Sequence, residues 1–435
     1  MSHRRHILSH PDADSVWRQT LPSNKNYVPC EDDVTADVAI VGGGITGLST
    51  ALHLAQQGIQ VCVLEGHQPG WGASGRNGGQ VNPTLKHDPA ALHKMLGDKA
   101  ESLIHAVSTS ADVVFELIEQ YQIACHPQRA GWIQASYTRA GAKRLHQRAE
   151  QWRRYEIPVE SLDARQMLAH TGTTTFQGGW IDGRAGSVHP YAYVCGLASV
   201  AEQLGATVYG NSVVTELKRT GRDWLVNTAV GGSVRAKQVI IATNGYTGVL
   251  LPRIASTVLA ANSFIVSTTA LGEQSNHVLP KGETLSTAQR LLLYLRKGPG
   301  GRLLLGGRGK FSDPDNEQDF LHLQRALNQL YPELAPLDFE YRWAGRIAIT
   351  RDFLPHVHQP ELGLTAALGY NGRGIATGTV MGKHLANLIA GKPAAEFPFP
   401  ISPVRKIPFH SLQRLYIAAG VAWFSLLDRV EWRGG

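Results

Sequence analysis

A glycine-rich turn between an apolar run and a helical pattern constrains the fold of this 435-residue chain more than any other feature. The segment 36–66, ADVAIVGGGITGLSTALHLAQQGIQVCVLEG, has the pattern of a strand, a turn, a helix and a second strand. The run Val38–Val41 does not alternate with polar residues, as expected for a parallel strand buried on both faces. Leucines and alanines then recur at helical spacing, and Gly58 ends the helix. We predict a right-handed βαβ unit at the N-terminal edge of a doubly wound sheet.

The turn itself has the GxGxxG spacing of dinucleotide-binding turns. Gly42 permits the tight turn, Gly44 lets a pyrophosphate approach the backbone, and Gly47 lets the helix pack against the strand. Glu65 stands 23 residues after Gly42, at the end of the next strand. A carboxylate there accepts hydrogen bonds from a ribose diol and disfavours a 2′-phosphate. The nucleotide is therefore predicted to be FAD or NAD rather than NADP.

A second glycine-rich stretch, GWGASGRNGGQ at 70–80, favours FAD over NAD. It follows the ribose-binding strand, where an FAD protein needs a loop that runs along the pyrophosphate and ribityl chain to the flavin. Three side chains offer donors for phosphate, namely Ser74, Arg76 and Asn77. Three glycines leave out side chains where the ring would lie, namely Gly75, Gly78 and Gly79. A flexible linker is the alternative, but Trp71 and Arg76 are not linker residues.

The charge of the chain points to a small anionic ligand or an acidic surface, since the net charge is +7 and the pI is about 9.2. The basic residues are scattered and form no dense run with interleaved aromatic residues, so nucleic acid is not an expected partner. The four cysteines form no CxxC pair, which argues against a disulfide framework or a zinc site. His356 and His358 share one face of a predicted strand but lack an evident third ligand, so no metal is expected.

Strand-turn-helix order returns near the C-terminus, at 361–391, after a long section of strands and hairpins. This return predicts an α/β plus antiparallel β fold: a discontinuous Rossmann-like FAD-binding domain with an inserted antiparallel-sheet substrate domain. The FAD-binding domain is assigned to 36–110, 185–255 and 340–395, and the substrate domain to 111–184 and 256–339. Residues 1–35 form an extended arm, and 396–435 form a tail.

The two ends of the chain carry further expectations. The N-terminus has basic residues but no apolar h-region, so a secretory signal is not expected and a cytoplasmic setting is the default. The tail contains ten uninterrupted apolar residues at 415–424, about half of a membrane span. A helix at 411–427 that docks on the protein body is favoured over one that lies on a membrane surface.

These motifs together resemble the FAD-dependent amine and amino-acid oxidase family that includes D-amino-acid oxidase, glycine oxidase and sarcosine oxidase. Within it, the chain looks most like the gamma-glutamylputrescine oxidase branch. The resemblance extends to "GSVHPYAYV", "KQVIIATNGYTG", "YRWAGRIAITRDFLPHV" and "GYNGRGIATGTVMGKHLANLI". It implies an inserted antiparallel sheet that covers the flavin, and oxidation of a C–N bond to an imine.

The resemblance also implies which residues contact FAD. The first group is Gly42, Gly44, Ile45, Thr46, Gly47, Glu65 and Gly66. The second is Ala73, Ser74, Arg76, Asn77, Gly78, Gly79 and Gln80. The third is Val214, Thr243, Asn244, Gly245, Gly372, Arg373, Gly374 and Ile375. The last four begin a helix whose positive dipole end stabilises the negative charge of reduced flavin. FAD is expected to be non-covalent, because no cysteine follows Cys195 and 70–80 contains no histidine.

Five residues are candidates for the substrate side: Arg346, Arg373, Arg308, Tyr294 and Tyr370. The first two fall at or within one residue of the places where relatives that oxidise amino acids have an arginine that binds the substrate carboxylate. The alternative is that each arginine is structural and that each tyrosine packs in the core. His189 is expected to cap or orient the helix entry beside Pro190 rather than to act as a base.

The expected activity is that of an oxidase for a small secondary amine or imino acid resembling gamma-glutamylputrescine, sarcosine or iminodiacetate. The substrate would pass a hydride to flavin N5, the imine would be hydrolysed, and O₂ would be reduced to H₂O₂. A dehydrogenase that passes electrons to a quinone or carrier protein is the first alternative. A flavoprotein that binds or modifies RNA is an alternative of a different class.

Overall fold

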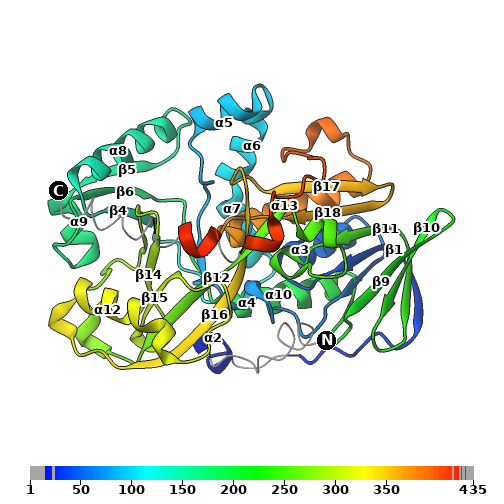
Figure 1. Cartoon of the computed structure of the whole chain (residues 1–435), viewed down its shortest axis with the longest axis horizontal. Coiled ribbons are helices and arrows are strands. Elements are labelled where there is room, and N and C mark those ends of the chain that lie inside the picture. The colour runs from blue at the N-terminus through cyan, green and yellow to red at the C-terminus, as the bar shows by residue number, and fades with distance from the viewer. Residues whose placement is uncertain (1–14, 22–24, 414–415, 421–422, 424–426, 428–435) are drawn as a thin grey trace.

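Two eight-stranded sheets with helices packed around them make up the protein (Figure 1). The computed structural model describes residues 15–21, 25–413, 416–420, 423 and 427. The first sheet lies on the right of Figure 1 and the second on the left. The fold is the expected combination of a Rossmann-like part and a sheet domain that is almost entirely antiparallel.

The first sheet has the strand order β17-β18-β11-β1-β2-β8. Its strands are β1 (Asp33–Val41), β2 (Val61–Leu64), β8 (Thr207–Tyr209), β11 (Ser233–Ile241), β17 (His356–Glu361) and β18 (Leu364–Leu368). The pairings β18-β11, β11-β1, β1-β2 and β2-β8 are parallel. The hairpin β9 (Val214–Thr220) and β10 (Asp223–Thr228) joins β11 through antiparallel pairing.

The predicted βαβ unit is present as β1, α3 (Ile45–Ala55) and β2, but not at an edge. β1 pairs with β11 on one side and with β2 on the other. The four last residues of β1, Val38–Val41, are all buried, because helices pack on one of its faces and residues of β9 and β10 pack on the other. The late strands β11 and β18 extend the sheet beyond β1, which places the glycine turn at the centre of the sheet's carboxyl edge.

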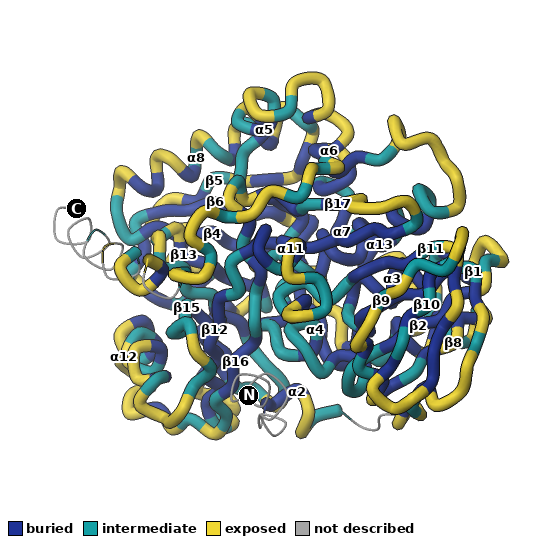
Figure 2. Tube along the Cα trace, turned by 45° about the vertical axis from the view of Figure 1, so that its right-hand side comes forward, coloured by how far each residue is buried: buried dark blue, intermediate teal, exposed yellow. Residues whose placement is uncertain are grey.

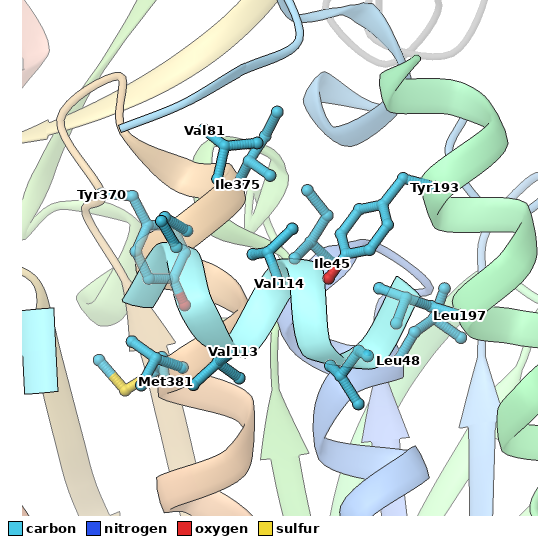
Figure 3. Close-up of a cluster of buried hydrophobic side chains, with 14 of the residues drawn as sticks. Ile45, Leu48, Val81, Val113, Val114, Tyr193, Leu197, Tyr370, Ile375 and Met381 are labelled. Atoms are coloured by element: carbon cyan, nitrogen blue, oxygen red, sulfur yellow. The ribbon is translucent and has the colours of Figure 1, made fainter. Parts of the chain in front are cut away.

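Four helices build the main core beside this sheet. α3 packs against α10 (Pro190–Gln203) and α13 (Gly374–Ile389), and α13 packs against α7 (Ser110–Gln120). Figure 3 shows side chains from these helices converging, with Val114 of α7 near Ile45 of α3 and Val113 near Met381 of α13. Burial of such side chains contributes about 1.5–3 kcal/mol each. The packing therefore fixes the N-terminal ends of α3 and α13 relative to each other.

The second sheet has the order β16-β12-β15-β14-β13-β4-β6-β5. Its strands are β4 (Trp132–Ser136), β5 (Val159–Asp163), β6 (Gly178–Asp182), β12 (Val258–Thr268), β13 (Thr284–Thr287), β14 (Leu293–Lys297), β15 (Leu303–Arg308) and β16 (Phe339–Thr350). Every pairing is antiparallel except β13-β4. α12 (Leu321–Leu330) buries Leu323, Leu327 and Leu330 against β12 and β15, and α8 (Arg139–Arg153) packs on β4, β5 and β6. Exposed residues follow the outer turns of α8 and α12 (Figure 2).

The remaining elements are short or connect the two sheets. They are α2 (Val16–Gln19), α4 (Ala73–Arg76), α5 (Pro89–Leu96), α6 (Lys99–Ser108), α9 (Ala164–Thr171), α11 (Pro252–Ala255), β3 (Gln80–Val81) and β7 (Gly186–Ser187). Single 3₁₀ turns are η2 (Asn244–Tyr246), η3 (Gly272–Ser275), η4 (Pro299–Gly301), η5 (Glu317–Phe320), η6 (Pro332–Leu334), η7 (Ala394–Glu396) and η8 (His410–Leu412).

Two predicted domain boundaries do not coincide with the sheets. Residues 340–350, assigned to the FAD-binding domain, belong to β16 and pair with β12 in the second sheet. Residues 111–120, assigned to the substrate domain, lie in α7 and pack against α13. In both cases the predicted boundary stands at the first residues of a regular element that belongs to the other part of the fold, so no linker composition marks the change. The domain division as a whole stays a prediction.

The N-terminal arm is not extended throughout, contrary to the prediction. Its residues Val16–Gln19 form the short helix α2, which Ser15 caps by accepting a hydrogen bond from the Arg18 N–H. Trp17 is fully buried against the protein body. Because an indole removes a large apolar area from water, this one side chain anchors the arm.

The predicted apolar tail helix falls partly outside the described residues. Within 415–424, residues 416–420 and 423 are described and are helical. Ile417 is buried, whereas Tyr416 and Trp423 are exposed. Across the described part of the chain, no helix combines the length and the hydropathy that crossing a bilayer requires.

Candidate active site

A cavity of about 1190 Å³ lies between the two sheets. Its walls include the glycine turn after β1, the loop 70–80, and the N-terminal end of α13. The second sheet contributes residues from β4, β12, β13, β14, β15 and β16. Segments from residue 41 to residue 375 therefore line one cavity. The sequence motifs predict several of these segments separately but not their arrangement around one space.

The glycine turn has the backbone geometry that its spacing predicts. Gly42 has a φ of +111°, which disfavours any side chain. A Cβ on Gly47 would lie 2.0 Å from the Gly42 carbonyl oxygen, so the third glycine lets α3 start against the turn. A Cβ on Gly44 would lie 2.8 Å from Ser74 Oγ, and this hydroxyl accepts a hydrogen bond from the Ile45 N–H at 3.1 Å. The N-terminus of α3 thus faces the cavity and Ser74.

Glu65 lies at the end of the cavity near Val214 and is enclosed by protein. Its carboxylate accepts hydrogen bonds from the Gly43 N–H at 2.7 Å and from the His67 N–H at 3.0 Å. Burial raises the pKa of Glu65, and these backbone donors act in the opposite direction. A carboxylate held in this way has lone pairs left for ribose hydroxyls.

Ser74, Arg76 and Asn77, the predicted phosphate donors of the loop 70–80, line the cavity. The Arg76 guanidinium stacks on the Trp71 ring at 4.5 Å and forms no ion pair with a described residue. The Asn77 amide instead closes the loop on itself, because it donates to the Ala73 and Ser74 carbonyls and accepts from the Gly79 N–H. Arg76 is therefore the free cation beside the α3 N-terminus.

Glycine is required at positions 75, 78 and 79 for a different reason from the one predicted. A Cβ on Gly75 would lie 2.2 Å from the Gly70 carbonyl oxygen, and one on Gly79 would lie 2.3 Å from Arg296 Nη1. Neither residue lines the cavity. Gly78 does line it, and there a Cβ would meet the Tyr294 ring at 2.6 Å. These glycines let protein pack behind and beside the loop rather than clearing space for the ring.

Most of the other predicted FAD residues line the same cavity. They are Ile45, Thr46, Gly66, Ala73, Gln80, Val214, Thr243, Asn244, Gly372, Arg373, Gly374 and Ile375. Gly47 and Gly245 do not, since Gly47 packs on Gly42 and Gly245 faces Arg346. α13 begins after Arg373 without a side-chain cap, so its first N–H groups are available to a ligand.

Arg373 and Arg346, the two predicted carboxylate-binding residues, lie in the cavity in different surroundings. Arg373 donates to the Thr84 hydroxyl and stacks on the Trp132 ring at 5.1 Å. Burial and the charge of Arg148 lower the pKa of Arg373. Arg346 pairs with Asp313 at 3.5 Å and lies over the Tyr246 ring at 5.6 Å. Arg373 thus has no carboxylate at ion-pair distance among the described residues, whereas Arg346 pairs with Asp313.

Tyr294 and Tyr370, proposed either to line the pocket or to pack in the core, do both: each lines the cavity and packs against protein. The Tyr370 hydroxyl accepts a hydrogen bond from Thr46 at 2.7 Å, and its ring joins the helical core (Figure 3). The Tyr294 hydroxyl lies 2.9 Å from Ser263 Oγ. Both hydroxyls have protein partners, so the rings act chiefly as apolar walls.

Lys86 is a cavity residue that the sequence analysis missed. It is accessible because it lines the cavity, and no hydrogen bond or ion pair joins it to a described residue. The surrounding protein and the charges of Arg373, Arg148 and Arg308 lower the pKa of Lys86 to about 8. The one hint in the sequence that Lys86 lies near the cofactor site is its position, six residues after the glycine-rich loop. Other missed residues of the cavity are Asn82, His87, Trp132, Tyr246, Asn262, Ser286 and Phe353.

The described lining of the cavity has a strong excess of positive charge. Its basic residues are Arg76, Lys86, Arg290, Arg308, Arg346 and Arg373, and its one acidic residue is Glu65. Arg308, the third predicted arginine, lies at the end of β15 and its guanidinium has no carboxylate partner among the described residues. The lining thus carries more positive charge than the two negative charges of a pyrophosphate could balance.

The remaining chemical candidates have structural roles. His189 is the N-cap of α10, as expected, because its Nδ1 accepts from the Ala192 N–H at 3.1 Å. His356 pairs with Asp352, and no group of three potential metal ligands occurs in the described residues. All four cysteines are free thiols and none lines the cavity.

These residues fit an FAD. The N-termini of α3 and α13 both face the cavity, that of α3 beside Ser74 and Arg76 and that of α13 beside Arg373. Each supplies donors to negative charge. The Asn82 Oδ1 atom is buried in the cavity without a partner, as expected for a group that a ligand satisfies. The groups predicted to bind the ribose, the pyrophosphate and the ring edge thus lie along one cavity.

Comparisons with known proteins agree with this geometry. The family model for FAD dependent oxidoreductases matches residues 37–388. Gamma-glutamylputrescine oxidoreductase of Escherichia coli is 31% identical over 425 residues, covering 94% of this chain and 97% of that protein. The crystal structure of glycine oxidase from Geobacillus kaustophilus has a TM-score of 0.72 at 22% identity, covering 86% and 99%. Iminodiacetate oxidase from Chelativorans sp. BNC1 has a TM-score of 0.68 at 20% identity, covering 85% and 100%.

The glycine turn, the buried Glu65, the second glycine loop and the end of α13 thus surround one cavity, and the family match spans all of them. The chain therefore belongs to the DAO family of FAD dependent oxidoreductases.

Proposed function

We propose that the protein oxidises a C–N bond of a small, anionic secondary amine or imino acid and uses O₂ as the final electron acceptor. Bound FAD supplies the hydride acceptor, so that the substrate becomes an imine, which water hydrolyses, and O₂ is reduced to H₂O₂. No protein nucleophile is needed for this reaction. The task of the chain is to hold the substrate C–H bond over the ring with its amine unprotonated.

The excess of cations in the cavity is the observation that carries this proposal. Lys86 and Arg308 lack carboxylate partners among the described residues, and Arg373 has only a hydroxyl and an aromatic face. A cation surrounded by protein is costly unless an anion compensates it. A carboxylate on the substrate supplies that compensation, whereas a free diamine adds repulsion.

The second sheet provides apolar surface around these charges. Trp132 is held by a hydrogen bond from its Nε1 to Ser286 Oγ at 3.0 Å, and Arg373 lies over its ring. Tyr294 forms a neighbouring part of the wall. We propose that these rings exclude water from the reacting C–H bond while Arg373 and Lys86 orient the carboxylate. The names of the three relatives, each an oxidoreductase or oxidase of an amine or amino acid, support the substrate class.

Anaerobic bleaching of the flavin by candidate substrates tests the proposal. The panel contains iminodiacetate, sarcosine, glycine, D-alanine, gamma-glutamylputrescine and putrescine. We expect bleaching by one or more of iminodiacetate, sarcosine and gamma-glutamylputrescine, and none by putrescine. Bleaching by putrescine alone, by glycine or D-alanine alone, or by none of the six, would overturn the substrate class.

The final acceptor is tested separately under air. An oxidase forms about one H₂O₂ for each imine product, and this ratio is measured with a peroxidase-coupled dye. Anaerobic bleaching without peroxide in air would show that a dehydrogenase is present and that the proposed acceptor is wrong.

A further inference from the structure

Three donors from distant segments bind the back of the loop 70–80, on the side away from the cavity. Trp343 Nε1 donates to the Arg76 carbonyl at 2.8 Å, and Trp17 Nε1 donates to the Asn77 carbonyl at 2.9 Å. Arg296 Nη1 lies 3.4 Å from the Gly78 carbonyl oxygen and 3.3 Å from that of Gly79. Four consecutive carbonyls of the loop thus have donors. We call Trp17, Arg296 and Trp343 the loop anchor.

The loop anchor is buried and compact. The exposed fractions are 0% for Trp17, 1% for Trp343 and 8% for Arg296. The two indole rings meet edge to face at 6.4 Å, and the Arg296 guanidinium lies 5.5 Å from the centre of the Trp17 ring. Arg296 also donates to the Val188 carbonyl at 2.8 Å and has no carboxylate partner in the described part of the chain. Its charge is therefore compensated by carbonyl dipoles of the loop and its surroundings.

None of the three residues lines the cavity, so they act on the loop from behind. The C=O and N–H of a trans peptide unit point in opposite directions. When Trp17 holds the Asn77 carbonyl on the back of the loop, the Gly78 N–H is turned to the other side. Gly78 lines the cavity there. The anchor thus sets the direction of loop amides that face a ligand.

We propose that the N-terminal arm is part of the FAD site, and that Trp17, together with Trp343 and Arg296, holds the loop 70–80 in the conformation that binds FAD. Trp17 comes from α2, outside the segment that matches the family model. The three are positioning residues, since they reach the cofactor only through the loop. The proposal rests on the FAD site and not on the identity of the amine substrate.

Titration of the apoprotein with FAD tests the role of the indole donors. Trp17→Phe and Trp343→Phe each keep an aromatic ring but leave one buried carbonyl without its donor. We expect the dissociation constant for FAD, measured by flavin fluorescence, to rise about tenfold in each variant. Trp224→Phe is the matched control, because Trp224 is also buried and donates to a carbonyl, that of Leu362 at 3.3 Å, far from the loop. The control should bind FAD like the wild type.

A measurement on the unaltered chain covers the case in which a variant fails to fold. If docking of the arm favours FAD binding, FAD must favour docking of the arm by the same factor. Tryptic cleavage after Arg18, the exposed residue next to Trp17, should slow about tenfold when FAD saturates the protein. Cleavage after Arg222, in the exposed turn between β9 and β10, should not change.

Two results would overturn the proposal. One is cleavage after Arg18 at the same rate with and without FAD. The other is an unchanged FAD dissociation constant in Trp17→Phe, or an equal rise in the Trp224→Phe control. Substrate turnover enters neither readout, so failure of the proposed amine oxidation would leave this inference intact.

Discussion

Lys86 is the single side chain whose charge state best reports on the cavity. Desolvation, reinforced by the charges of Arg373, Arg148 and Arg308, lowers its pKa to about 8. Only its protonated form attracts an anion. The dissociation constant of succinate, a carboxylate that lacks an oxidisable amine, should therefore rise as pH passes through 8 and level off at about ten times its value at lower pH. The change in flavin absorbance on binding measures it.

Two substitutions separate the charge of Lys86 from its bulk. Lys86→Met should weaken succinate binding at pH 7 about tenfold and remove the pH dependence near 8. Lys86→Arg should retain binding at pH 7 and move the loss to higher pH, because a guanidinium keeps its proton longer. Equal affinity and equal pH dependence in wild type and Lys86→Met would show that the ammonium does not contact the anion.

At the level of residues, sequence reasoning succeeded where backbone geometry dictates the residue type. Gly42 needs a positive φ, Gly47 needs to touch a carbonyl, and Glu65 ends a strand at a fixed spacing from the turn. Lys86 could not be predicted, because its role follows from the lack of a carboxylate partner among the described residues. Only the folded positions of α13 and the second sheet around it show this lack.

The joint between α2 and α10 is an element-level feature that depends on pH. His189 Nδ1 accepts from the Ala192 N–H, and Nε2 lies 3.1 Å from the Thr20 hydroxyl, which donates to the Val16 carbonyl. This arrangement needs a neutral imidazole with its proton on Nε2. Burial, with the neighbouring charges of His126 and Arg296, lowers the pKa of His189 to about 4.

The sign of the pH effect follows from this lowered pKa. The unfolded chain takes up a proton near pH 6.5 and the folded chain only near pH 4, so stability falls as pH falls through this interval and is constant above it. The His189 contribution to the loss is at most about 3 kcal/mol. His189→Asn keeps a neutral N-cap and should lose less stability between pH 7 and 4.5 in urea unfolding. An identical pH dependence in both proteins would contradict the assignment.

Elements with a clear period were predicted to within a residue or two. The helix expected at 139–154 is α8, Arg139–Arg153, and the last strand, turn and helix are β18 and α13. α2 was missed because four residues give no period, and its stability comes from burial of Trp17 rather than from helix propensity. β16 was placed with the wrong sheet because pairing partners are not written in a strand's own pattern.

At the scale of the whole molecule, the residues that line the cavity decide whether FAD could be attached covalently. None of the four cysteines lines it, and the lining histidines are engaged elsewhere. His67 stacks on Trp71 at 4.0 Å, and His87 Nε2 lies 2.6 Å from the Asp352 carbonyl. We predict that FAD is bound without a covalent link. Acid precipitation should release the yellow flavin into the supernatant, and a yellow pellet would contradict the prediction.

The order of the segments around the cavity also has a consequence for biosynthesis. β1 leaves the ribosome early, but its neighbour β11 follows about 200 residues later, and the amides of Gly374 and Ile375 come later still. The FAD-binding cavity therefore cannot form until synthesis of the chain is almost complete. Loading of FAD is expected to be a post-translational step, so cells short of riboflavin should accumulate full-length apoprotein rather than truncated chains.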